Sequence, residues 1–185
     1  MRYLVVCGGK IDKEFGLNEI KTDGIDAIIA ADSGMDFLYE NGVTPDIIVG
    51  DFDSATTKAL EFFERKGQTE IHRLNPIKDD TDTEYAIRLA IREGARSIVV
   101  LGATGSRIDH VLGNISLLGI GLESKTDISI IDTNNRIRMA DKPVTIEKSA
   151  QYGRFVSLIA VTDDNEVSLK GFKYPVTDYS FDRFT

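Results

Sequence analysis

The chain has 185 residues, of which 42% are hydrophobic and 28% are charged, a composition typical of a folded globular protein. Its 22 Lys and Arg against 30 Asp and Glu leave a formal net charge of −8, which disfavours nucleic acids and anionic membranes as partners. The longest apolar runs, such as 115–122, fall short of the roughly 20 residues that cross a bilayer, so we expect a cytoplasmic protein without membrane span or signal peptide.

Short apolar strands alternate with helix-length segments over the first 124 residues. Runs rich in Val, Ile and Ala predict strands at 4–6, 27–31, 47–49, 71–74 and 98–101. Helices are predicted at about 34–41, 54–66, 82–94 and 109–122. Strands that are apolar on both faces and separated by helices indicate an α/β fold, with a mainly parallel sheet covered by helices on both faces.

The predicted helices end near residue 124. Beyond it, short strands are predicted at 128–131, 136–139, 144–147, 155–161 and 167–169. Turn residues such as Asn134-Asn135 separate them. We therefore predict an α/β domain at 1–124, followed by a small antiparallel β-sandwich domain at 125–185, and we expect further strands of that sandwich beyond residue 185.

Acidic residues, small residues and glycines follow nearly every predicted parallel strand. These segments are 7–9, 31–34, 50–54, 78–82 and 102–107. In an open parallel sheet such positions share one edge, which is where ligands bind. Helix capping is the alternative explanation for part of the pattern, because Ser54 and Thr81 stand where helix N-caps belong.

Six aspartates are expected to meet at this edge: Asp32, Asp51, Asp53, Asp79, Asp80 and Asp82. Their mutual repulsion at close range calls for a cation, whereas capping would need only one acid per helix. Oxygen ligands without a neighbouring His or Cys select Mg²⁺, or alternatively Mn²⁺, over zinc. Mg²⁺ usually completes its coordination shell with water and phosphate oxygens, so a phosphate ligand is expected as well.

The turn at 102–105, Gly-Ala-Thr-Gly, precedes a predicted helix and can present backbone N–H groups to an anion. Arg107 follows it and can bind phosphate through two parallel hydrogen bonds. The turn, the arginine and the acids together predict phosphoryl or pyrophosphoryl transfer from a nucleotide. Neither the P-loop signature nor the G-x-G-x-x-G fingerprint is present.

Four segments, in this order and spacing, closely resemble those of bacterial thiamine pyrophosphokinases. They are Ala31-Asp32-Ser33-Gly34, Gly50-Asp51-Phe52-Asp53-Ser54, Lys78-Asp79-Asp80-Thr81-Asp82, and 102–110 with its Arg107-Ile108-Asp109-His110 ending. The resemblance implies a reaction in which ATP and thiamine give AMP and thiamine diphosphate. It also implies a homodimer whose active sites use residues from both subunits.

The resemblance further implies roles for single residues. Asp51, Asp53 and Asp79 match the magnesium-binding aspartates, and with Arg107 they are the expected catalytic residues. The expected nucleotide- and cofactor-binding residues are Asp32, Ser33, Ser54, Lys78, Thr81, Asp82, Gly102, Thr104, Gly105, Asp109, His110 and Asn114. Two alternatives stay open: a magnesium-dependent phosphatase with Asp51 and Asp53 as its nucleophile pair, and a non-catalytic nucleotide-binding module.

Overall fold

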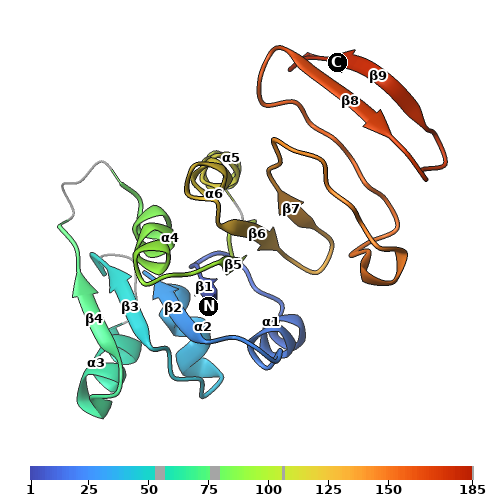
Figure 1. Ribbon diagram of the computed structural model, residues 1–185. Helices are drawn as coiled ribbons and strands as arrows, with labels where there is room; N and C mark the ends of the chain where they lie inside the picture. Colours follow the sequence, from blue (N-terminus) through green and yellow to red (C-terminus); the bar gives the residue numbers. More distant parts are fainter. Residues whose placement is uncertain (53–56, 76–79, 106, 185) are drawn as a thin grey trace. The chain divides into compact units, whose positions relative to one another are not determined.

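A computed structural model describes residues 1–52, 57–75, 80–105 and 107–184 (Figure 1). The chain divides into two compact units, Met1–Tyr152 and Gly153–Thr185. Within the described ranges, no helix combines the length and the apolar character that a membrane span requires.

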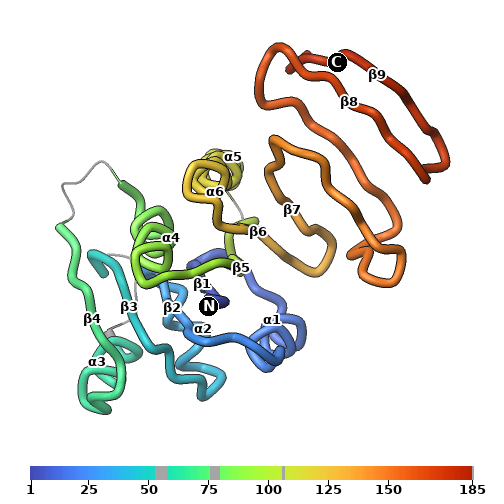
Figure 2. Tube along the Cα trace, in the orientation of Figure 1, coloured from blue at the N-terminus to red at the C-terminus, as the bar shows by residue number. Residues whose placement is uncertain are grey.

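A seven-stranded sheet forms the centre of the N-terminal unit, as far as the described residues show. Its strands, in spatial order, are β4 (Glu70–Arg73), β3 (Ile47–Gly50), β2 (Ala27–Ala31), β1 (Arg2–Val6), β5 (Ser97–Leu101), β6 (Asp127–Ile131) and β7 (Arg136–Arg138). Neighbouring strands pair in parallel except β7, which is antiparallel to β6. Figure 2 shows β1, in blue, in the middle of the sheet between β2 and β5.

Helices cover both faces of this sheet (Figure 1). One face carries α1 (Lys13–Ile20), α2 (Gly34–Glu40) and α3 (Thr57–Lys66), and the other carries α4 (Asp82–Arg92), α5 (Ile108–Ser116) and α6 (Leu118–Ser124). A short 3-10 helix, η1 (Lys148–Ala150), follows near the end of the unit. The predicted parallel α/β architecture is therefore confirmed.

Successive side chains of β1 point to opposite faces of the sheet and so belong to two separate core clusters. Leu4 and Val6 pack into the cluster on the side of α1, α2 and α3, whereas Val5 and Cys7 pack into the cluster on the side of α4. Leu4, Val5 and Val6 are fully buried. Because burial of one such side chain contributes about 1.5–3 kcal/mol, the apolar character of both faces commits β1 to the centre of the sheet.

Two helical regions differ from the sequence-based prediction. Helix α1 was not predicted, and the last predicted helix is two helices in the structure. Gly16 interrupts the apolar stripe of α1, but the Asp12 side chain caps the helix by accepting a hydrogen bond from the Phe15 N–H at 2.9 Å. The segment predicted as one helix at 109–122 forms α5 and α6, which meet at Leu117.

Strands β6 and β7 correct the predicted start of the β-domain. They were expected in the sandwich after residue 124, but β6 pairs in parallel with β5, with Ile98 opposite Ile128. Ile130 and Ile131 are buried in the core clusters on opposite faces of the sheet, so β6 needs cover on both faces, and α6 packs against it on one of them. The boundary between the two compact units consequently falls between Tyr152 and Gly153 in the chain.

The C-terminal unit contains a two-stranded antiparallel sheet of β8 (Asn165–Leu169) and β9 (Val176–Phe181). This agrees with a small antiparallel β part, although β9 was not predicted. The strands predicted at 144–147 and 155–161 are irregular segments. Phe155 and Ile159 are 81% and 86% exposed, so this apolar segment is not packed into a core. An apolar run forms a strand only where a neighbouring strand supplies hydrogen-bond partners.

Candidate functional site

The order of the strands reverses between β1 and β5. The chain proceeds from β1 through β2 and β3 to β4 on one side, then returns to place β5 on the other side of β1. In open α/β sheets the carboxyl ends of two such strands form the crevice in which ligands bind. The turns that follow them, at 7–9 and 102–105, therefore lie at the expected binding position.

Glycines allow these two turns to touch through their backbones. The Gly9 N–H donates to the Gly102 carbonyl at 3.0 Å, and a Cβ on Gly9 would lie only 2.2 Å from that oxygen. Gly102 has a φ of +71°, and a Cβ there would lie 2.3 Å from the carbonyl oxygen of Cys7. A side chain at either position would force the turns apart, so both glycines are required by geometry.

Polar contacts hold the second turn from its other side. The Asn114 side chain on α5 donates to the Ala103 carbonyl at 2.9 Å. Thr104 forms a side-chain hydrogen bond with Asp132, which follows β6. Burial alone would raise the pKa of Asp132, but this bond and those from Asn134 and Asn135 bring it below its ordinary value. The ionised Asp132 therefore anchors the turn.

Sequence reasoning missed Asp132. The signal was available, because Asp132 follows a predicted strand just as the acids at 32 and 51 do. It was overlooked because that strand was assigned to the β-domain, whereas its pairing with β5 brings Asp132 to the turn at 102–105.

Three aspartates from three different elements meet at the same edge of the sheet. Asp32 follows β2, Asp51 follows β3, and Asp82 begins α4. Each offers one carboxylate oxygen, and these oxygens all lie within 4.8 Å of one another. All three residues are partly buried, and Oδ1 of Asp32 is shielded from solvent.

Local structure explains how two of these acids reach the cluster. The Asp32 N–H donates to the Val49 carbonyl at 2.7 Å, which ties the end of β2 to β3. Thr81 is the N-cap of α4 and accepts a hydrogen bond from the Glu84 N–H at 3.1 Å. The capping explanation thus holds for Thr81, and it leaves the Asp82 carboxylate beside Asp32 and Asp51.

This cluster suits a hard divalent cation. Two unit charges about 4 Å apart repel by about 4 kcal/mol at the effective dielectric constant near a protein surface, so three carboxylates favour a cation between them. The three carboxylate oxygens lie within 4.8 Å of one another, close enough that all three residues would hold the same small cation. The donors are carboxylate oxygens, which favour Mg²⁺ or Mn²⁺ over zinc.

Other residues predicted to bind nucleotide or phosphate lie near the two glycine turns and at the start of α5. Arg107 and Asp109 form an exposed bidentate pair, with Nε to Oδ1 at 3.2 Å and Nη2 to Oδ2 at 2.6 Å. The hydrogen bond from Arg107 lowers the pKa of Asp109. His110 is exposed, and Ser33 precedes α2 and packs against Gly8. Asp53, Ser54, Lys78 and Asp79 lie outside the described residues.

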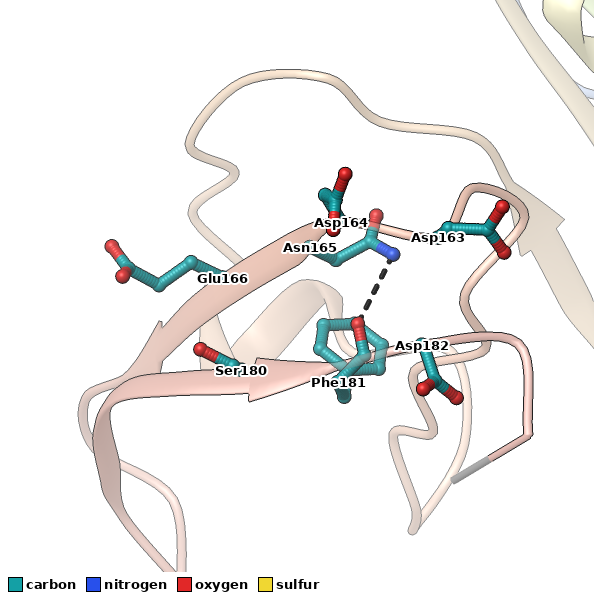
Figure 3. A pocket seen from close by; sticks show the side chains of 7 residues that line it. All are labelled: Asp163, Asp164, Asn165, Glu166, Ser180, Phe181 and Asp182. Atoms are coloured by element: carbon teal, nitrogen blue, oxygen red, sulfur yellow. Dashed lines mark hydrogen bonds between the residues drawn. The ribbon is translucent and has the colours of Figure 1, made fainter.

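A hollow of about 430 Å³, apart from the acidic cluster, lies in the C-terminal unit (Figure 3). Asp163, Asp164, Glu166 and Asp182 contribute carboxylates to its lining. Asp163 is already paired with Arg183, at 2.6 Å between Oδ1 and Nε. Its lining was not singled out in the sequence, and we assign it no chemistry.

Residues 21–131 match the protein family described as thiamin pyrophosphokinase, catalytic domain. Residues 143–184 match the thiamin pyrophosphokinase, vitamin B1 binding domain. The chain belongs to the thiamin pyrophosphokinase family. The part of this chain that matches the catalytic domain contains Asp32, Asp51 and Asp82 together with the turn at 102–105.

Individual thiamin pyrophosphokinases agree with this assignment. The chain is 36% identical over 152 residues to thiamine pyrophosphokinase of Bacillus subtilis, an alignment covering 81% of this chain and 70% of the relative. It is also 36% identical over 80 residues to thiamine pyrophosphokinase 1 of Oryza sativa, covering 40% of this chain and 30% of the rice protein.

Solved structures of thiamin pyrophosphokinases share the fold. The crystal structure of the Bacillus subtilis enzyme superposes with a TM-score of 0.86 at 31% identity, covering all of this chain and 86% of that chain. The crystal structure of the Geobacillus thermodenitrificans protein superposes with a TM-score of 0.78 at 26% identity, covering all of this chain and 84% of that chain. The resemblance seen in the sequence is confirmed, and with it the enzyme class.

Proposed function

We propose that the chain transfers the pyrophosphoryl group of ATP to the hydroxyl group of thiamine in a Mg²⁺-dependent reaction that gives thiamine diphosphate and AMP. Membership of the thiamin pyrophosphokinase family supports the reaction. The observation that carries the proposal is the meeting of Asp32, Asp51 and Asp82 at the sheet edge that also holds the glycine turns. The proposal places the enzyme in the cytoplasm, where ATP is supplied.

The transfer forms one bond and breaks one bond. The thiamine hydroxyl oxygen attacks the β-phosphorus of ATP, and the bond from this phosphorus to the oxygen bridging to the α-phosphate breaks. AMP leaves with the electron pair of the broken bond, while the hydroxyl proton passes to an acceptor at the same edge. Most of the work of the protein is therefore positioning and charge stabilisation rather than covalent chemistry.

At this edge of the sheet, the acidic residues are proposed to bind the metal ion. Asp32, Asp51 and Asp82 would hold the divalent ion, with Asp53 and Asp79 as further predicted ligands. When bound, Mg²⁺ supplies neutralisation of the polyphosphate charge.

The residues proposed to bind the phosphate groups of ATP are those around the turn at 102–105. The turn at 102–105 precedes α5, and its backbone N–H groups are proposed to contact phosphate oxygens. Arg107 is proposed to exchange its bidentate contact with Asp109 for a contact with phosphate, which offers the same fork geometry.

The C-terminal part supports two finer proposals. Residues 143–184 match a vitamin B1 binding domain, so we place thiamine contacts there. We also propose a homodimer that shares its active sites. Support comes from the exposed apolar side chains of the segment 155–161, because a folded protein rarely leaves such a run in contact with water.

The decisive experiment incubates the protein with ATP, Mg²⁺ and thiamine and separates the nucleotide products. We expect AMP and thiamine diphosphate in equal amounts, and no product when EDTA replaces Mg²⁺. The control is Asp51→Asn, which removes one charge from the cluster and should reduce kcat by at least about a hundredfold.

Three outcomes would contradict the proposed reaction. ADP in place of AMP would mean transfer of a single phosphoryl group. Phosphate release without thiamine would favour the magnesium-dependent phosphatase, in which an aspartate acts as nucleophile. ATP binding without any product would favour a non-catalytic nucleotide-binding module.

A further inference from the structure

Phe52 has a backbone conformation that is rare for a bulky side chain. It directly follows Asp51 and has a φ of +64°, in the left-handed region. Asp32, at +48°, is also in this region, but aspartate tolerates it far better than phenylalanine does. Strained backbone of this kind persists where the surrounding structure holds it in place, and it concentrates at functional sites.

Two neighbours hold the ring of Phe52. A Cβ added to Gly50 would lie 3.1 Å from Cε1 of the ring, so the ring rests against the Gly50 backbone. On strand β4, the guanidinium carbon of Arg73 lies 5.3 Å from the ring centroid, within the range of a cation–π contact. Arg73 is directly opposite Gly50 in the β3–β4 register, which explains why it reaches the ring.

The same glycine connects the ring to the acidic cluster. A Cβ on Gly50 would also lie 3.1 Å from Cα of Asp32. The Leu74 N–H donates to the Gly50 carbonyl at 2.9 Å, which fixes the end of β3 against β4. The ends of β2, β3 and β4 are therefore packed around Gly50, with the Phe52 ring against it.

We propose that Phe52 is a positioning residue for the acidic cluster. Its left-handed backbone turns the chain immediately after Asp51, and its ring, held by Gly50 and Arg73, keeps the Asp51 carboxylate beside Asp32 and Asp82. Phe52 acts through Asp51 and needs no contact with substrate. This inference rests on the proposed function, because it assumes that the cluster binds a divalent ion.

The first test substitutes Phe52 and measures Mn²⁺ binding to the full chain by electron paramagnetic resonance, without nucleotide. Phe52→Ile keeps an apolar side chain, but its branched Cβ disfavours the left-handed region more strongly. We expect the dissociation constant for Mn²⁺ to rise about tenfold or more in this variant. Phe52→Tyr keeps the ring and should stay within about twofold of wild type.

A second pair of variants tests the ring contact without changing Phe52. Arg73 also pairs with Glu64, and both side chains are substantially exposed, so substitution there leaves the core intact. Arg73→Met removes the guanidinium group and should weaken Mn²⁺ binding by about threefold. Glu64→Gln is the matched control, because it breaks the ion pair but leaves the guanidinium over the ring, and we expect it to bind Mn²⁺ like wild type.

Thermal melting of each variant without metal separates positioning from simple stabilisation. A purely structural ring would lower the melting temperature of Phe52→Ile and Arg73→Met while leaving Mn²⁺ affinity unchanged, and that result would overturn the inference. If Phe52→Ile fails to fold, the comparison of Arg73→Met with Glu64→Gln decides.

Asp51→Asn serves as the reference for the metal site itself. Loss of Mn²⁺ binding in Asp51→Asn together with wild-type binding in Phe52→Ile would remove only the positioning role. Equal Mn²⁺ binding by wild type and Asp51→Asn would remove the proposed metal site, and the positioning role with it.

Discussion

Asp32, Asp51 and Asp82 bring three carboxylate oxygens within 4.8 Å of one another, a cost to the folded state that a bound cation would offset. Asp51→Asn should therefore melt at the same or a higher temperature than wild type in EDTA, and should gain much less stability from Mg²⁺. A ligand at 100 times its dissociation constant stabilises the fold by about 2.7 kcal/mol, an effect that calorimetry resolves.

The matched control for this comparison is Asp141→Asn, which neutralises an exposed acid outside the cluster. It should keep the stabilisation by Mg²⁺ that we predict for wild type. Equal stabilisation of Asp51→Asn and wild type would mean that Asp51 contributes nothing to cation binding.

Cys7 gives a residue-level prediction of pH dependence. Burial raises the pKa of its thiol from 9.0 to about 11, partly countered by the hydrogen bond from Thr83 at 3.4 Å. Above pH 9 the unfolded chain loses the thiol proton while the folded chain keeps it. The raised pKa therefore makes the free energy of unfolding depend on pH. The stability that the folded state gains from its protonated thiol is fully present below about pH 9, and up to about 2 kcal/mol of it is lost as the pH rises toward 11.

Urea denaturation of wild type and Cys7→Ala at several pH values isolates this contribution from the titration of tyrosines and lysines. The difference in unfolding free energy between the two proteins should shrink between pH 9 and 11. A difference that stays constant over this window would show that the thiol ionises equally well in both states.

At the level of single elements, the start of α4 depends on Thr81. Its hydroxyl accepts the hydrogen bond from the Glu84 N–H, one of the four N–H groups that a helix start leaves without a partner within the helix. Thr81→Ala should lower the free energy of unfolding by about 1 kcal/mol in urea denaturation. Thr81→Ser keeps the hydroxyl and should retain most of that stability.

The Michaelis constants of these two variants address the nucleotide role predicted for Thr81. If Thr81 is a cap alone, the Michaelis constant for ATP should be similar in Thr81→Ala and wild type once both are folded. A rise confined to Thr81→Ala would support the predicted contact with nucleotide.

The elements differ in how far the sequence predicts them. The strands at 27–31 and 98–101 were predicted because each is apolar on both faces, a pattern that only a covered strand satisfies. The segment 155–161 was predicted as a strand but is irregular and exposed, because strand formation depends on a partner that the local sequence does not specify. Helix α1 was not predicted because its apolar stripe is weak. The N-cap formed by the Asp12 side chain stabilises the helix nevertheless.

For the whole molecule, the proposed homodimer predicts a defined mass in solution. We expect light scattering to give twice the mass of one chain, because a second copy would cover the apolar segment 155–161. The double variant Phe155→Ser/Ile159→Ser changes two exposed side chains and should shift the protein toward the monomer without lowering its melting temperature sharply.

A wild-type protein that is monomeric at micromolar concentration would contradict the proposed dimer. A double variant that remains fully dimeric would place the interface elsewhere. Activity measured on the same samples would show whether the assembly is needed for turnover.

The sequence by itself determined the mainly parallel α/β sheet and the edge that carries the acids, because apolar runs select buried strands and parallel strands share one carboxyl edge. Among the described residues, only the tertiary structure decided that Asp32, Asp51 and Asp82 meet, since they come from segments far apart in the chain. It also decided that β6 joins the large sheet and brings Asp132 to the glycine turn. Those outcomes depend on pairing between distant strands, which local patterns do not encode.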